Sequence, residues 1–163
     1  MEFIVDEVDS LNIQDSTMTE LLNDVYVVEN YVEPGVAKKL FETTSIKDRG
    51  VILCAIEKQS RTLAGSVIFV PSNSPACKLA KKNESEMQLL CVRPEYRNKG
   101  LGTLLVNSVL NIAKQKGSNK MILWTQRSMK SAQKLYLKSG FVHIENITKN
   151  HIEFLVYEKK IIK

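Results

Sequence analysis

The sequence predicts an α/β protein, or α+β in some schemes, built around one central, mixed and twisted sheet with helices on its faces. Two runs rich in β-branched residues, 50–57 and 63–70, predict a hairpin that turns around residues 58–61. From residue 86 onward, strand-like and helix-like segments alternate, as in a β-α-β-α-β unit. The wholly apolar segment 121–124 is typical of a strand that is covered on both faces.

The elements expected before the hairpin are a strand and two helices. Residues 2–8 have the pattern of a short strand, and residues 17–30 carry apolar side chains at the helical positions 18, 21, 22, 25 and 28. Pro34 suits the first turn of a second helix, which is expected to end near residue 44. After the hairpin, residues 71–84 hold two prolines and three lysines and are expected to form a surface loop.

The second half of the chain is expected to contain two further helices, each followed by a glycine. Gly117 and Gly140 stand where a left-handed residue commonly ends a helix, so they help to set the helix boundaries. The expected elements are a strand at 86–92, a helix at 100–116, a strand at 121–124, a helix at 129–139 and paired strands at 141–147 and 152–157.

Composition excludes several classes of protein. No apolar run approaches the roughly 18 residues that a membrane span needs, and the N-terminus lacks the basic and apolar regions of a secretory signal. The three cysteines form no CxxC pair and lie far from both histidines, which predicts reduced thiols, a cytoplasmic location and no metal site. The net charge of +5 comes without interleaved aromatic residues or a recognition helix, so we expect no nucleic-acid partner.

Acidic and basic residues are distributed unevenly along the chain. Residues 1–37 contain nine Asp or Glu and no Lys or Arg, so all 23 basic residues follow them. This asymmetry predicts two faces of different charge, one of them anionic, that attract different partners. The alternative is an ordinary solvated surface.

The segment from residue 92 to residue 103 carries the strongest signal for a site. A strand ends, a polar loop turns, and Gly100 and Gly102 open a helix without side chains that would obstruct a ligand. A helix start presents unpaired N–H groups and the positive end of its dipole, where Arg97 and Lys99 are unfavourable unless an anion lies beside them. A pyrophosphate would resolve that conflict, whereas the alternative is a glycine-rich turn with solvated bases.

Two nucleotide-binding motifs do not fit this loop. The sequence contains no GxxxxGK[ST], and Leu105 stands where GxGxxG needs its third glycine. Instead, Arg97-Asn98-Lys99-Gly100-Leu101-Gly102 resembles the R/Q-x-x-G-x-G/A motif of the GNAT superfamily of acyl-CoA N-acyltransferases. A second stretch, 132–141 (AQKLYLKSGF), resembles the A-x-x-[LF]-Y-x-x-x-G-F block of the same superfamily. The similarity covers 86–157, while residues 1–84 agree only in the order of their elements.

The resemblance implies the GNAT fold, with about seven strands and four helices in one domain over residues 1–163. Residues 1–84 would form the acceptor side and residues 85–158 the acetyl-CoA-binding core. The pantetheine arm would lie between two splayed strands, one ending near Val92 and one containing Trp124. The implied activity is N-acetyl transfer from acetyl-CoA, as co-substrate, to a primary amine, with no metal.

The resemblance also implies which residues contact the co-substrate. Backbone groups of Leu90, Cys91 and Val92 would pair with pantetheine. The pyrophosphate would lie on the loop and first helical turn formed by Arg97, Asn98, Lys99, Gly100, Leu101, Gly102 and Thr103. The sequence departs from the family pattern at Met129, where many members carry an asparagine that contacts the pantetheine arm. Ser131, or alternatively Ser128, is the predicted substitute for that contact.

Two residues are predicted to carry the chemistry. A lysine-like amine has a pKa of about 10.4, so its deprotonation at pH 7 costs roughly 4–5 kcal/mol and a base would help. Glu86 is the predicted base because its position resembles that of the base glutamate in the superfamily and it shares strand parity with Gln88, Leu90 and Val92. Glu84 is the second candidate, and a solvated acid is the alternative. Tyr136 is the predicted general acid that protonates the departing CoA thiolate, although spacing alone would favour a core tyrosine.

The remaining predictions concern mechanism and partners. Cys91 has no histidine partner, so we expect direct transfer in a ternary complex rather than an acyl-cysteine. In this superfamily the first two helices wall the acceptor site, so Asp15, Glu20 and Asp24 predict a cationic acceptor such as a polyamine, a small amine or a peptide amine. The alternative function is a non-catalytic module of the same fold that binds or senses acyl-CoA. The sequence leaves the oligomeric state open, a homodimer included, and predicts no membrane partner.

Overall fold

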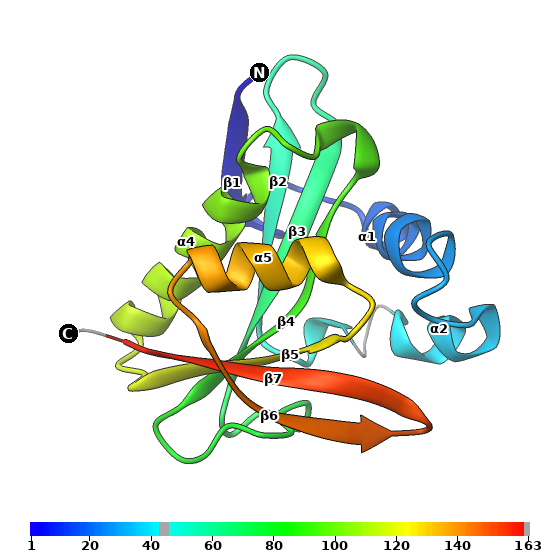
Figure 1. Ribbon diagram of the computed structural model, residues 1–163. Helices are drawn as coiled ribbons and strands as arrows, with labels where there is room; N and C mark the ends of the chain where they lie inside the picture. The colour runs from blue at the N-terminus through cyan, green and yellow to red at the C-terminus, as the bar shows by residue number, and fades with distance from the viewer. Residues whose placement is uncertain (43–45, 162–163) are drawn as a thin grey trace.

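The structure is a computed structural model that describes residues 1–42 and 46–161. Its strands form one seven-stranded sheet in the order β1-β2-β3-β4-β5-β7-β6, drawn in Figure 1. The strands are β1 (Phe3–Glu7), β2 (Val51–Glu57), β3 (Leu63–Pro71), β4 (Ser85–Val92), β5 (Lys120–Gln126), β6 (Val142–Lys149) and β7 (Ile152–Lys160). Neighbouring strands are antiparallel except β4 and β5, which run parallel. The predicted mixed sheet and its β2–β3 hairpin are confirmed.

The helices lie where the apolar periodicity and the glycines predict them, except that the end of the first predicted helix is a π-helical turn. The helices are α1 (Asp15–Leu22), α2 (Pro34–Leu40), α4 (Leu101–Gln115) and α5 (Lys130–Lys138), with a π-helical turn η1 (Asn23–Val27) directly after α1 and a 3-10 turn η2 (Pro94–Tyr96) before α4. Gly117 and Gly140 follow their helices with positive φ angles of 77° and 93°, as expected of C-terminal glycines. The predicted end of the second helix near residue 44 lies outside the described residues.

The helices cover the two faces of the sheet, because each strand alternates its side chains between them. On β2, Leu53 and Ala55 pack in a core with α4 and α5, whereas Ile52 and Cys54 pack in a second core with α1, η1 and α2. Figure 1 shows α4 and α5 on one side of the central strands, and α1 and α2 on the right of the view. The N-terminal acidic segment therefore covers one face and the glycine-led helix α4 the other.

A β-bulge interrupts this alternation on β4. Leu89 has a φ angle of 52°, and the pairing with β3 shifts register between Ser66 and Ile68. Met87 and Leu89, two residues apart, consequently pack in opposite cores. Leu90 then packs on the α4–α5 side. The strand parity predicted for 86–92 is therefore wrong beyond Gln88, because the extra residue reverses which face each later side chain occupies.

None of the helices in residues 1–42 and 46–161 combines the length and the apolar character that a membrane crossing requires.

Candidate active site

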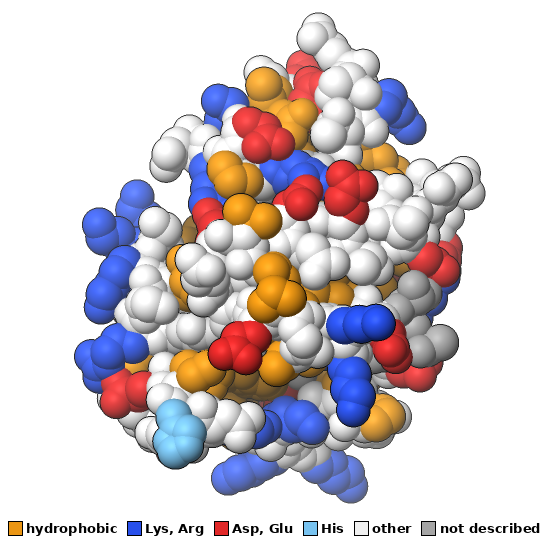
Figure 2. All heavy atoms as spheres, turned by 90° about the vertical axis from the view of Figure 1, so that its right-hand side faces the viewer, with side chains coloured by type: hydrophobic (Ala, Val, Ile, Leu, Met, Phe, Trp, Pro, Cys, Tyr) orange, Lys and Arg blue, Asp and Glu red, His pale blue; other side chains and the backbone are white. Residues whose placement is uncertain are grey.

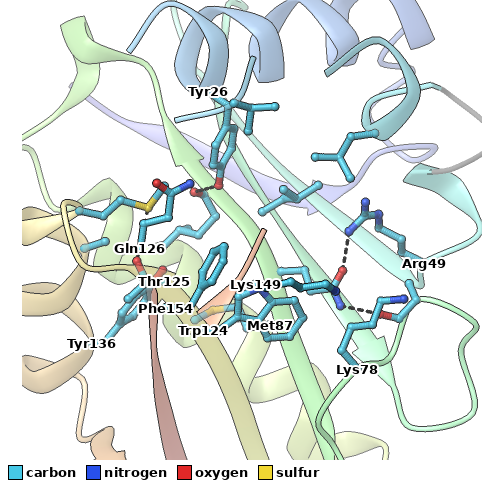
Figure 3. A pocket seen from close by; sticks show the side chains of 18 of the residues that line it. Tyr26, Arg49, Lys78, Met87, Trp124, Thr125, Gln126, Tyr136, Lys149 and Phe154 are labelled. Atoms are coloured by element: carbon cyan, nitrogen blue, oxygen red, sulfur yellow. Dashed lines mark hydrogen bonds between the residues drawn. The ribbon is translucent and has the colours of Figure 1, made fainter. Parts of the chain in front are cut away.

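Strands β4 and β5 separate after a short parallel pairing. Their register joins only Ser85 with Met121 and Glu86 with Ile122, although both strands continue for several residues. A cavity of about 610 Å³ opens where they separate. Residues of both strands line it, together with side chains from η1, α5 and the segments around residues 49 and 76; those labelled in Figure 3 are Tyr26, Arg49, Lys78, Met87, Trp124, Thr125, Gln126, Tyr136, Lys149 and Phe154.

A tyrosine from the helical layer of α1 and α2 hydrogen-bonds the bulged part of β4. The π-helical turn η1 directs Tyr26 toward β4, where its hydroxyl donates to the carbonyl oxygen of Leu90 at 2.8 Å, the contact drawn dashed in Figure 3. Burial raises the pKa of Tyr26 well above its usual value, so the phenol stays protonated and able to donate. No sequence pattern pointed to this residue, because the contact joins positions 64 residues apart.

Tyr136 lies on the wall of the same cavity with its hydroxyl unengaged. Its ring packs near Phe141 and Tyr157, with centroids 6.0 and 6.1 Å away. No described residue hydrogen-bonds its hydroxyl, and only 6% of the side chain is exposed. Burial raises the pKa of Tyr136 above its usual value, so the group is a neutral phenol at physiological pH. Such a group can donate a proton or a hydrogen bond to a ligand in the cavity.

Glu86, the predicted base, lies behind the cavity wall. It is fully buried and is not among the residues that line the cavity. Its Oε2 accepts the backbone N–H groups of Lys78, Leu79 and Ala80, and its Oε1 accepts the Gln88 amide at 2.9 Å. The carboxylate therefore holds the loop that precedes β4. This loop is the physical reason for its place, because its N–H groups occupy the carboxylate and separate it from the cavity, and the role of base remains a prediction.

Replacing Glu86 with glutamine tests this structural role. Glutamine replaces one acceptor oxygen with an NH2 group, which would face either the loop N–H groups or the Gln88 amide, so a donor meets a donor in both orientations. E86Q is therefore expected to lower the free energy of unfolding by about 1–3 kcal/mol in urea denaturation. Glu84, the other candidate base, lies 3.8 Å from Lys120 and outside the cavity. E84Q serves as the control, with an expected change below about 1 kcal/mol. A stable E86Q protein that had lost 10²–10⁴ in kcat would restore the role of base.

The glycine-led turn before α4 has the geometry of an anion-binding helix start. Gly100 caps the helix with a φ angle of 79°, no side chain bonds the first turn, and a Cβ at this position would meet nothing within 4 Å. Because the first helical N–H groups have no partner inside a helix, they are free to bind an anion. Gly102 serves packing as well, since a Cβ there would lie 2.9 Å from Leu135 of α5.

The arginines near this turn are already paired with acids of the N-terminal segment. Arg97 donates from both terminal nitrogens to Glu29, at 2.6 and 2.9 Å, and from Nε to the carbonyl oxygen of Val92. Arg93 pairs with Asp24 at 2.6 Å. The Arg97 guanidinium is therefore engaged within the protein, and Glu29 is an anion beside it. The backbone N–H groups at the start of α4 are not paired with these acids, so they are the groups that could bind an anion.

These ion pairs also change the expectation for the acceptor. Asp15 pairs with Lys47 at 3.1 Å and Asp24 with Arg93, and neither acid lines the cavity; nor does Glu20. Figure 2 shows acidic, basic and apolar side chains next to one another across the middle of one face, not a single anionic surface. The charged side chains on the cavity wall are Asp48, Arg49, Lys78 and Lys149. The described cavity wall thus carries more positive than negative side chains, and the predicted anionic wall is absent from it. The charge of the acceptor remains a prediction.

The predicted replacements for the missing asparagine do not reach the cavity. Ser128 and Ser131 are both exposed, and neither lines it. Met129 itself lines the cavity, and its sulfur accepts a hydrogen bond from the Thr125 hydroxyl at 3.3 Å. The polar residues nearest to Met129 in the sequence that line the cavity are Thr125 and Gln126 on β5. The contact predicted for Ser131 therefore lacks support from its position.

Cys91 is a buried thiol beside a serine. Its sulfur lies 3.5 Å from Ser66 Oγ, and only 3% of the residue is exposed. Burial raises the pKa of Cys91 to about 11, so the thiolate needed for nucleophilic attack is scarce at pH 7. Its side chain is not on the cavity wall. In the described part of the chain, no group of three or more His, Cys, Asp and Glu residues is arranged to hold a metal ion.

Comparison with known proteins places the chain in a family. Residues 15–141 match the family described as Acetyltransferase (GNAT) family. An uncharacterized N-acetyltransferase of Schizosaccharomyces pombe is 33% identical over 108 residues, which span 66% of this chain and 61% of that protein. The chain therefore covers less than two thirds of that relative's length.

Solved structures with low sequence identity share the fold. A GNAT-family acetyltransferase from Staphylococcus aureus Mu50 aligns with a TM-score of 0.79 and 16% identity, covering 99% of this chain and 100% of that one. A PaiA N-acetyltransferase from Thermoplasma acidophilum, in complex with coenzyme A, aligns with a TM-score of 0.72 and 20% identity, covering 98% and 99%. The resemblance seen in the two sequence motifs is confirmed, and the chain belongs to the acetyltransferase (GNAT) family of N-acetyltransferases.

Proposed function

We propose that this protein transfers an acetyl group from acetyl-CoA directly to a primary amine, within a ternary complex. The observation that carries the proposal is the cavity between the parted strands β4 and β5, with the unengaged Tyr136 phenol on its wall. We also propose that residues 1–84 form the acceptor side and residues 85–158 the co-substrate core. Both parts contribute to the cavity, through Tyr26 and Arg49 on one side and Leu90 and Tyr136 on the other.

The co-substrate would follow β4 into α4. The bulged backbone at Leu90–Val92 is proposed to pair with the pantetheine arm, since the register with β3 leaves out Leu89 and Leu90 and β5 has already separated. The pyrophosphate is proposed to lie against the backbone N–H groups between Asn98 and Thr103. The helix dipole and the absence of a side chain at Gly100 support that position.

Tyr136 is proposed as the general acid. Attack of a neutral amine on the thioester breaks the carbon–sulfur bond and releases a CoA thiolate, which must be protonated. Because burial raises the pKa of Tyr136, the phenol is protonated throughout the neutral range and is a weaker acid than a free tyrosine. Proton transfer to the thiolate therefore depends on a hydrogen bond that holds the phenol against the sulfur. The amine is proposed to pass its own proton through a water molecule to Asp48, the one carboxylate among the described residues that line the cavity.

Turnover tests the proposed function directly. The purified protein is incubated with acetyl-CoA and a panel of primary amines, and free CoA is measured with a thiol reagent while acetylated product is measured by mass spectrometry. We expect stoichiometric CoA and acetyl-amine. Binding of acetyl-CoA without turnover on any amine would instead support a sensing module, and absence of binding would contradict both.

Gly100 offers a test of the pyrophosphate position that has a matched control in the same helix. Gly100 and Gly117 flank α4 with φ angles of 79° and 77°, and a Cβ at either position would meet nothing within 4 Å. Alanine at each is expected to cost about 1–2 kcal/mol of stability through left-handed strain. Only G100A is expected to weaken coenzyme A binding, by about tenfold in titration calorimetry. Equal affinities for the two variants would contradict the assignment.

A further inference from the structure

Arg49 is a cation on the wall of the cavity without an acidic partner. Its Nη1 donates to the Gln88 side chain at 2.6 Å, and its Nε is buried with no acceptor among the described residues. No described carboxylate lies within ion-pair distance of it, although Asp48 precedes it in the chain. The neighbouring residues 43–45 are Thr, Thr and Ser, which carry no charge.

This position is unlike that of the other arginines around the site. Arg93, Arg97 and Arg127 each pair with a carboxylate. Burial lowers the pKa of Arg49, which reflects the cost of keeping its charge away from water. A partly buried charge without a counter-charge is destabilising, and the donors of a guanidinium match the oxygens of a carboxylate or phosphate.

The surroundings of Arg49 strengthen that reading. Lys78 and Lys149 line the same cavity, so three bases face one acid, Asp48. Figure 3 shows Arg49 and Tyr136 on opposite sides of the cavity. A ligand that reaches both would therefore be extended, with its reacting group near Tyr136 and its anionic group near Arg49.

We infer that the acceptor is an amine that also carries a carboxylate, and that the Arg49 guanidinium binds this carboxylate. The inference rests on the proposed acetyl transfer and specifies its substrate class. Gln88 positions the guanidinium through the 2.6 Å bond, and is itself fixed by donating to the carbonyl oxygen of Ala76 and to Glu86. A planar carboxylate matches the planar donor edge that a guanidinium presents.

A matched series of acceptors tests the inference with the unaltered protein. Amino carboxylates of increasing chain length, from glycine to 6-aminohexanoate, are compared with the corresponding amides, which lack the negative charge at the far end. Because the amide also lowers the amine pKa in the shortest pairs, kcat/KM is expressed per neutral amine in every case. We expect kcat/KM to favour the carboxylate by about 10- to 100-fold at the best chain length. If amides and carboxylates are acetylated equally well, the inference is overturned while the acetyl transfer stands. If no amine is acetylated, the proposed function itself fails.

Variants then assign the preference to Arg49. In R49M the carboxylate-to-amide ratio of kcat/KM is expected to fall to about 1, and in R49K to an intermediate value. K149M, which removes another cation from the cavity wall, is the control and is expected to keep most of the preference. A ratio that survives in R49M but falls in K149M would overturn the assignment to Arg49.

Discussion

Replacing Tyr136 with phenylalanine is expected to lower kcat by about 10²–10⁴ while leaving the free energy of unfolding within about 0.5 kcal/mol of the wild-type value. The proton donor disappears, but no hydrogen bond to a described residue is lost, because the Tyr136 hydroxyl makes none. Steady-state release of CoA measures the first quantity and urea denaturation the second. Affinity for coenzyme A, measured by calorimetry, should change little, since the predicted loss lies in the chemical step.

Tyr26 provides the control for that experiment, because it is a second tyrosine, half-buried, on the same cavity wall. Its hydroxyl is committed to the Leu90 carbonyl. Y26F should therefore lower the free energy of unfolding by about 1–3 kcal/mol, the cost of an unsatisfied buried acceptor, and reduce kcat by less than about tenfold. Equal losses of kcat in the two variants would attribute the effect to the shape of β4 and remove Tyr136 as the acid.

Replacing Phe141 with alanine is expected to cause the largest loss of stability, about 3–5 kcal/mol. Phe141 is 2% exposed, packs edge-on against the Tyr136 ring at 6.0 Å, and bonds through its N–H to the Tyr136 carbonyl oxygen. The cavity left by alanine would therefore lie directly behind the proposed acid. Since typical domains are stable by only 5–15 kcal/mol, the variant should unfold at markedly lower urea concentration.

The adjacent residue supplies the control for this prediction. Val142 is 56% exposed, so V142A removes a side chain from the same strand end without opening a core cavity. Its expected change is within about 0.5 kcal/mol. A loss below about 1 kcal/mol for F141A would show that Phe141 does not anchor α5, and that another contact holds Tyr136 in place.

Local patterns of the sequence predicted the backbone well. Alternating apolar residues, the β-branched hairpin and the glycines after two helices depend on neighbours within a few positions, so they could be interpreted without the fold. The same holds for the turn at Gly100 and for the two family motifs, which are contiguous stretches. The π-helical turn that presents Tyr26 was missed, because its apolar spacing is close to that of an α-helix.

Side-chain roles were predicted less well wherever they depend on distant partners. The shared face predicted for Glu86, Leu90 and Val92 is wrong because one extra residue in β4 reverses strand parity after Gln88. Glu86 itself lies away from the cavity because the loop at 78–80 folds back onto its carboxylate. The acids of the N-terminal segment looked like an anionic wall, yet Glu29 and Asp24 pair with bases 68 and 69 residues away. No pattern in the sequence indicated that Arg49 would lie on the cavity wall without a carboxylate partner among the described residues.

The sequence by itself determined the order of elements, the family and the loop that opens α4, since each is written in consecutive residues. Only the tertiary structure decided which ionisable groups line the cavity and which form ion pairs with one another. The physical reason is that a charge is neutralised by whatever lies nearest in space, and packing across the sheet brings together residues that no local pattern relates.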